Sequence, residues 1–150
     1  MPVKSLFDPE LVSLMEYRIT KSSIVTPDNF NEGRVVGHQL DHSLKLGFNA
    51  EEKMARVAFS LTIKTTSDNH NKAEATGNFQ FAFFYRIENS EELITLDKKK
   101  QMTVHADLSH ALASLTYSTS RGILLVHLQG TALHNFKLPI IHPSKLVKGE

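Results

Sequence analysis

Three stretches of the sequence alternate between apolar and polar residues, and this alternation constrains the fold more than any other feature. Residues 36–48, 55–65 and 75–87 each place mostly apolar side chains at every second position, with His38 and His42 on that face of the first stretch. Successive side chains of a β-strand point to opposite faces of its sheet, so the pattern predicts three strands with one buried face. A fourth stretch, residues 14–25, is rich in β-formers but less regular. We expect it to form an edge strand or a strand with a bulge.

Short polar joints connect the regular stretches. Residues 49–53 and 67–72 are turn-like, and connections of this length join antiparallel neighbours. The middle of the chain is therefore expected to form a meander. The first joint, residues 26–34, is longer and carries the apolar Phe30 among turn-forming residues. Its length and composition favour a crossover over a tight hairpin.

The spacing of apolar residues changes to three and four positions in the second half of the chain. Between residues 103 and 128 this spacing predicts a long amphipathic helix. Its middle, residues 116–122, is poor in helix formers, and a glycine such as Gly122 costs a helix about 1 kcal/mol relative to alanine. A kink or a close helix contact would explain that composition. Gly130 is placed to end the helix.

The C-terminal part of the sequence is expected to be extended. Residues 136–143 contain two prolines, which disfavour helix immediately before them. Residues 144–148 remain for a short last helix. Strands followed by a helix indicate an α+β fold in which the helix covers one face of the sheet. The 150 residues have the usual size of one domain.

Composition and charge exclude several classes of protein. The 17 basic and 16 acidic residues leave a net charge of +1, which gives no long-range field for nucleic acid or anionic lipid. The absence of cysteine excludes a disulfide framework and thiolate zinc sites, and it fits a reducing compartment. No run of about 18 apolar residues exists, and the first residues do not resemble a signal peptide. We expect a cytoplasmic protein that does not insert into membranes.

Eight histidines invite a test of metal binding. His38 and His42 lie about 13 Å apart along a strand, too far to ligate one ion. His105 and His110 lie about 140° apart around a helix, so they do not converge. The spacing of the remaining histidines that the fold could bring together, His127, His134 and His142, gives no support for a site. The sequence predicts no metal.

No catalytic signature is present either. The chain lacks a Gly-x-Ser-x-Gly elbow, and Asp107, Ser109 and His110 are neighbours on one helix without the geometry of a proton relay. Glu51 and Glu52 lie in a turn that water will reach, where a raised carboxyl pKa is hard to maintain. The glycines form no phosphate-binding loop. We expect no catalytic residue and no cofactor, and therefore not an enzyme.

Some apolar residues belong to no face that a regular element would bury. Phe84 lies on the polar face of its predicted strand. The tail offers Phe136, Leu138, Ile140 and Ile141 without a periodicity that would bury them all. A single layer of sheet and helix also leaves surfaces open. Such patches mark an oligomer interface or a groove for apolar partners.

The order of the elements and several local sequences resemble the SecB family of cytoplasmic chaperones of protein export. The resemblance covers residues 14–146. Its best-marked pieces are Ala-Thr-Gly-Asn-Phe-Gln-Phe at 75–81 with the acidic exit turn at 87–93, Ser-Arg-Gly at 120–122 in the helix, and Phe-Lys-Leu-Pro-Ile-Ile at 136–141. None of these pieces is a catalytic signature, and their order along the chain carries the resemblance.

The resemblance implies one SecB-like α+β domain over residues 1–150. In it, a four-stranded antiparallel sheet would carry a long helix and a short C-terminal helix on one face. It also implies a homotetramer, a dimer of dimers with the long helices packed between the dimers. Leu112, Leu115 and Gly122 are the interface residues that we predict. A missing side chain at Gly122 would let two helices approach closely.

The function implied by the resemblance is that of an ATP-independent holdase for unfolded preproteins. Extended segments of such clients would bind in apolar and aromatic grooves, without nucleotide, cofactor or metal, under the crossover that carries Phe30. The substrate-binding residues that we predict are Phe30, Phe84, Phe136, Leu138, Ile140 and Ile141.

Two departures from the family pattern leave alternatives open. Export chaperones of this family are usually acidic, which helps them meet the translocase motor SecA, whereas this chain is nearly neutral. Its second helix and acidic tail also look short. Holding clients is therefore better supported than handing them to SecA. A solitary SecB-like chaperone that protects an antitoxin is one alternative, and a non-enzymatic small-ligand or assembly module is another.

Overall fold

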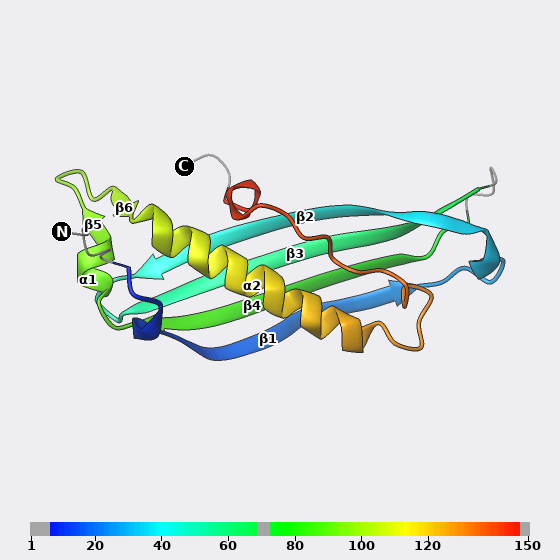
Figure 1. Ribbon diagram of the computed structural model, residues 1–150, viewed down its shortest axis with the longest axis horizontal. Coiled ribbons are helices and arrows are strands. Elements are labelled where there is room, and N and C mark those ends of the chain that lie inside the picture. The colour runs from blue at the N-terminus through cyan, green and yellow to red at the C-terminus, as the bar shows by residue number, and fades with distance from the viewer. Residues whose placement is uncertain (1–6, 69–72, 148–150) are drawn as a thin grey trace, which may run out of the picture.

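The computed structural model describes residues 7–68 and 73–147 and places a four-stranded sheet beneath one long helix (Figure 1). Its elements in chain order are the 3₁₀ turn η1 (Pro9–Leu11), β1 (Val12–Val25), η2 (Glu32–Arg34), β2 (Val35–Asn49), β3 (Met54–Ser67), β4 (Thr76–Ile87), the short helix α1 (Ser90–Leu93), β5 (Ile94–Leu96), β6 (Met102–Val104), the long helix α2 (Ala106–His127) and η3 (Pro143–Lys145).

The sheet has the strand order β1-β4-β3-β2, and every neighbouring pair is antiparallel. The meander predicted for the middle of the chain is β2–β3–β4, although residues 69–72 of its second joint lie outside the described residues. Strands β1 and β2 are consecutive in the chain but occupy opposite edges, so residues 26–34 form the predicted crossover. The pairing of β1 shifts between Leu14 and Glu16 and again between Ile19 and Lys21. The fourth stretch is thus both an edge strand and a bulged one.

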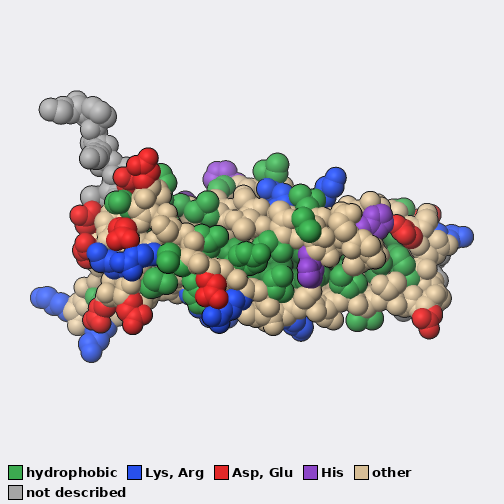
Figure 2. All heavy atoms as spheres, turned by 90° about the horizontal axis from the view of Figure 1, so that it is seen from below, with side chains coloured by type: hydrophobic (Ala, Val, Ile, Leu, Met, Phe, Trp, Pro, Cys, Tyr) green, Lys and Arg blue, Asp and Glu red, His purple; other side chains and the backbone are tan. Residues whose placement is uncertain are grey.

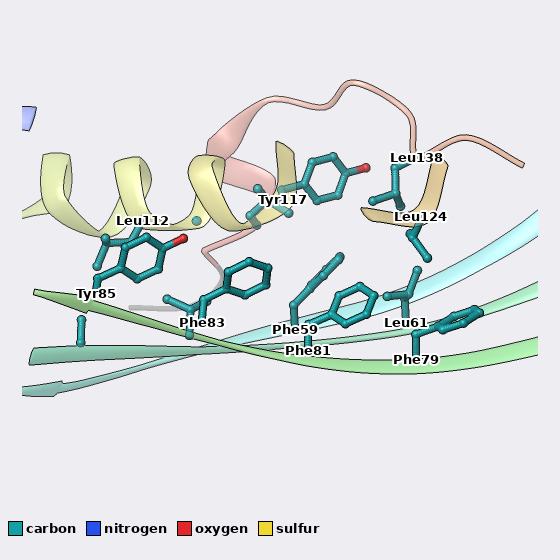
Figure 3. Packing of buried hydrophobic residues seen from close by; sticks show 14 of the residues in the cluster. Phe59, Leu61, Phe79, Phe81, Phe83, Tyr85, Leu112, Tyr117, Leu124 and Leu138 are labelled. Atoms are coloured by element: carbon teal, nitrogen blue, oxygen red, sulfur yellow. The ribbon is translucent and has the colours of Figure 1, made fainter. Parts of the chain in front are cut away.

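The core lies between α2 and the sheet face that the alternating apolar residues form. Strand β3 contributes Ala55, Val57, Phe59, Leu61 and Ile63, and β4 contributes Phe79, Phe81, Phe83, Tyr85 and Ile87, all buried. Figure 3 shows the rings of this face, together with Leu61, pointing toward the side of α2 that carries Leu112 and Leu124. The Tyr85 hydroxyl lies 2.8 Å from Thr116 Oγ1, a hydrogen bond that satisfies both buried oxygens.

The long helix differs from its prediction at the N-terminus. Residues 103 and 104 were expected to be helical, but Met102–Val104 pairs with Ile94–Leu96 as a small hairpin. The helix begins only after His105, whose side chain caps it by accepting a hydrogen bond from the Asp107 amide. Beyond its end, Gly130 turns the chain with a φ of +77°, as the prediction of a stop there requires.

Neither explanation proposed for Gly122 finds support within the chain. Figure 1 shows α2 as one uninterrupted helix. A side chain added at Gly122 would meet no atom within 4 Å. Glycine at this position is therefore not required by any contact that the described residues make.

The C-terminal segment runs back along α2 in an extended conformation (Figure 1). Two side chains of the helix hold its backbone: the Tyr117 hydroxyl donates to the Pro139 carbonyl oxygen at 2.6 Å, and Arg121 Nε donates to the Leu138 carbonyl oxygen at 3.1 Å. The short last helix that we predicted is the single 3₁₀ turn η3, and residue 148 lies outside the described residues.

Candidate binding surfaces

The diagonal path of α2 across the sheet leaves two regions of the core-bearing face uncovered by the helix (Figure 1). The region beside β2 is filled by the chain's own C-terminal segment. The Phe136 ring lies 5.4 Å from the His38 ring of β2, and Phe136 and Leu138 are only 6% and 3% exposed. Two of the predicted substrate-binding residues are thus buried in the core of the chain itself, and a client would reach them only by displacing this segment.

The region beside β1 stays open. Leu14, Tyr17 and Ile19 lie opposite Tyr85, Phe83 and Phe81 of β4, so they share the face that bears the core. They are 45%, 50% and 40% exposed. The Tyr17 ring stacks on the buried Phe83 ring with a centroid distance of 6.0 Å. We call these three residues, with the exposed Met15 at the first bulge, the β1 surface.

Figure 2 looks onto the β1 side of the molecule and shows hydrophobic side chains gathered along its middle. The strand pairs only with β4, so no strand in the described part of the chain pairs with its outer backbone edge. An edge strand of this kind can accept a further strand through main-chain hydrogen bonds, which do not depend on the sequence added. The β1 surface therefore combines an open edge with exposed apolar side chains.

The sequence contained one signal for the β1 surface. Leu14, Tyr17 and Ile19 are apolar and are separated by charged residues, which is the pattern of a half-buried strand. The bulges break the strict period of two, and the pattern cannot indicate whether a helix covers the apolar side. Site prediction from the sequence therefore missed these residues.

A second apolar surface lies on the outer side of α2. Leu115, Gly122, Leu125 and Val126 recur at the spacing of one helix face and are all exposed. Two of the predicted interface residues, Leu115 and Gly122, belong to this helix stripe. Leu112 does not, because it faces the sheet and is fully buried.

The other predicted substrate-binding residues do not meet in one groove. Phe30 packs partly on the core beside a hollow of about 480 Å³ between the crossover and the turn after α2. Ile140 is 89% exposed, whereas Ile141 packs partly on the core. Phe84 lies on the opposite face of the sheet, beside Arg56 and Arg18.

A larger hollow of about 800 Å³ lies where the end of β2 meets β6 and the first turn of α2. Its lining includes Leu46, Phe48, Val104 and Val147, and it also includes Ser109. The Ser109 hydroxyl is buried and has no hydrogen-bond partner among the described residues. Thr103 and His110 also belong to the lining, so the walls are partly apolar and partly polar.

Burial is the main cause of the pKa shifts of three titratable groups on the core-bearing face. Burial raises the pKa of the Tyr85 and Tyr117 hydroxyls and lowers the pKa of His38, which favours the neutral form of all three. Within residues 7–68 and 73–147, no three His, Asp or Glu side chains gather closely enough to hold a metal ion. No helix in the same ranges is both long and apolar enough to cross a membrane.

A four-stranded antiparallel sheet with a long helix and a short second helix on one face is the architecture of a SecB-like fold. The structure that establishes this likeness is the Mycobacterium tuberculosis Rv1957 SecB-like chaperone in complex with a ChAD peptide from the Rv1956 HigA1 antitoxin. The two structures superimpose with a TM-score of 0.58 over 89% of this chain and 91% of Rv1957, at 13% sequence identity. At that identity the likeness establishes the fold alone.

Other comparisons add little. A protein of unknown function from Streptococcus agalactiae reaches a TM-score of 0.34 at 11% identity, over 86% of this chain and 97% of that one, which is too weak to support an argument. No protein-family model matches the chain. No curated protein matches its sequence.

Proposed function

We propose that this protein is an ATP-independent chaperone that holds extended apolar segments of unfolded clients. The observation that carries the proposal is the β1 surface, where Leu14, Tyr17 and Ile19 are about half exposed beside an open strand edge. The SecB-like fold supports it, because Rv1957, a chaperone with that fold, is bound to a peptide. As a chaperone, the protein would perform no catalysis and need no cofactor.

Binding at the β1 surface would combine two contributions. Main-chain hydrogen bonds along β1 would accept any extended segment, and the apolar side chains would favour segments with hydrophobic residues. Each buried apolar side chain contributes about 1.5–3 kcal/mol before ordering costs. Such contacts tolerate varied sequences and persist in salt, because they are not screened as charges are. Phe30, Ile140 and Ile141 would add separate apolar contacts for a longer client.

The test is suppression of aggregation of a reduced, unfolded protein in the absence of ATP. Tyr17→Ser combined with Ile19→Ser should weaken the suppression, whereas Val36→Ser, which alters an exposed apolar residue of β2, should leave it unchanged. Alanine substitutions at Phe30 and Ile140 would show whether these residues contribute. Equal activity of the β1 variant and the unmutated protein would refute the assignment of the surface. A small molecule copurifying at one equivalent would instead support a ligand-binding module.

We propose further that the single domain assembles as a homotetramer, a dimer of dimers, with the helix stripe of α2 in an interface. The exposed apolar side chains of Leu115, Leu125 and Val126, with the bare backbone at Gly122, support this assembly. Gly122→Leu should reduce the mass measured by light scattering, because it overpacks a close helix contact. Gly122→Ala, a smaller change, is the matched control. A monodisperse monomer for the unmutated protein would contradict this proposal.

Two cellular roles fit a holdase of this fold. In the first, the protein acts in the cytoplasm on preproteins destined for export, with or without SecA as a partner. In the second, it protects an antitoxin, and the antitoxin peptide bound to Rv1957 is the observation that favours it. The near-neutral net charge argues against strong engagement of SecA. Titration with an unfolded preprotein and with an antitoxin encoded beside the chaperone would separate the two roles by affinity.

A further inference from the structure

The sheet face turned away from α2 is basic. Its strands present six basic side chains, from Arg18, Lys21, Lys45, Arg56, Lys64 and Arg86, each on the side opposite the core. Glu16 and Asp41 are the acidic side chains that the four strands place there. The face therefore carries a net charge of +4 in a chain whose total is +1.

Several of these charges are available to a partner. Arg18 is forked onto Glu16, with its Nε 2.7 Å from the Glu16 carboxylate, and Arg86 lies 2.7 Å from Glu88. Lys21, Lys45 and Arg56, in contrast, have no carboxylate within 4 Å among the residues that the structure describes. These three cations are exposed and are not paired with a carboxylate, although Arg56 also lies over the Phe84 ring.

The middle of the face is locally low. On the two central strands Ala58 lies opposite Ala82, and next to this pair Ser60 lies opposite the longer Gln80. A hollow of about 250 Å³ opens over Ser60 and Gln80, and its lining includes Lys21 of β1 and Asp41 of β2. The hollow therefore has a cation on its β1 side and a carboxylate on its β2 side, and the other free cations lie in the neighbouring rows of the sheet.

Along the strand direction the spacing of the free cations matches that of an extended peptide, while Lys45 and Lys21 reach inward from opposite edge strands about 14 Å apart. Arg56 and Lys45 belong to successive rows of the sheet, because Lys45 pairs with Ala58, two residues beyond Arg56. Lys21 belongs to the following row, because it pairs with Gln80, which pairs with Ser60. Rows of a sheet are about 6.6–6.8 Å apart, which is also the distance between alternate side chains of an extended chain.

We propose that this face binds an extended acidic segment of another protein, with carboxylates at alternate positions. Guanidinium and ammonium groups are the natural partners of carboxylates. The proposal is independent of the apolar surfaces, which lie on the other side of the sheet or on α2.

A nucleic acid fits the same face less well. Single strands are held by bases stacked on free aromatic rings, and Phe84 is the aromatic ring that the four strands place on this face. The guanidinium carbons of Arg18 and Arg56, from the strands on either side, lie 5.6 and 5.9 Å from its centroid. These cations occupy the approaches to the ring that a base would need.

The test uses a fluorescent peptide of alternating glutamate and serine, with a peptide of alternating glutamine and serine as its neutral control. Fluorescence anisotropy should show saturable binding of the acidic peptide alone, weakened by raising the salt concentration. Lys45→Gln combined with Arg56→Gln should weaken binding about fivefold, given that one exposed ion pair changes an affinity by a factor of about 1.5 to 5. Lys98→Gln combined with Lys99→Gln removes the same charge from a loop off this face and should change binding less than twofold.

Three results would overturn the proposal. One is the absence of saturable binding by the acidic peptide. Another is an equal loss in the two double variants, which would indicate only a net-charge effect. The third is displacement of the peptide by single-stranded oligothymidine at lower concentrations than by unlabelled peptide, which would assign the face to nucleic acid. Suppression of aggregation should be the same in the Lys45→Gln/Arg56→Gln variant as in the unmutated protein, so failure of this proposal and failure of the chaperone proposal are measured separately.

Discussion

Adding one methyl group at Gly77 should measurably destabilise the protein. A Cβ atom at this position of β4 would lie 2.5 Å from Leu133 Cδ1 and 2.8 Å from Phe79 Cε2. Leu133 and Phe79 are 0% and 1% exposed, so neither side chain can move toward solvent to make room. Overpacking of this kind costs about 1–3 kcal/mol. The lower entropy of the unfolded alanine chain offsets about 0.4–1 kcal/mol of that, and the midpoints of the two ranges leave a net loss of about 1.3 kcal/mol for Gly77→Ala.

Urea denaturation followed by circular dichroism measures this loss. Gly77→Ala should lower the midpoint without changing the slope, because the native and unfolded states expose the same surface as before. Gly37→Ala is the matched control in β2, where an added Cβ meets no atom within 4 Å, and it should not destabilise the protein. Leu133→Ala on its own should cost about 2–5 kcal/mol, and in that background Gly77→Ala should lose the part of its effect that comes from Leu133, while the contact with Phe79 remains. A Gly77→Ala protein within about 0.5 kcal/mol of the unmutated one would refute the packing argument.

Three further predictions concern ionisation and the C-terminal segment. Burial lowers the pKa of His38 below its usual 6.5, so His38 of the unfolded chain binds a proton at a higher pH than His38 of the folded protein. The free energy of unfolding should therefore fall as the pH drops from 7.5 through 6.5. Urea midpoints at several pH values should show this dependence, and the His38→Gln variant should lack it. Burial acts to raise the pKa of Glu74, but hydrogen bonds from Thr65 and Ser67 lower it overall. The stabilising contribution of the ionised Glu74 should therefore disappear as the pH falls below about 4.5. In the Glu74→Gln variant the urea midpoint should depend less on pH in that range. Arg121→Met removes the hydrogen bonds to the Leu138 and Pro139 carbonyls, so hydrogen exchange at the Phe136 amide, which donates to the Leu133 carbonyl, should become faster while exchange in α2 stays unchanged.

The sheet could be predicted because its strands repeat one simple pattern. Every second residue from 55 to 63 in β3 and from 79 to 87 in β4 is apolar, and all of these residues are buried. The hairpin of β5 and β6 could not be found in this way, because strands of three residues are too short to show a period. The predicted helix was therefore extended over part of the hairpin.

The candidate site was harder to predict because exposure depends on contacts between distant segments. Phe136 and Ile140 both belong to the apolar tail, yet the first is buried against β2 and the second is exposed. That difference follows from the path of the tail, which Tyr117 and Arg121 fix through backbone carbonyls. Hydrogen bonds to carbonyl groups leave no trace in the sequence of the segment that is held. Tyr17 stays exposed for a similar reason, because the diagonal of α2 decides which side of the sheet it covers.

The pairing of β1 with β4 has a consequence for folding during synthesis. Val12 pairs with Ile87 and Val25 with Thr76, so β1 must wait for partners about 50 to 75 residues further along the chain, a separation that slows folding. At a synthesis rate of about 5–20 residues per second, that wait lasts roughly 3 to 15 s. Throughout it, Leu14, Tyr17 and Ile19 lie in a strand that has no sheet. The nascent protein is then itself an extended apolar segment of the kind that we propose a finished copy holds.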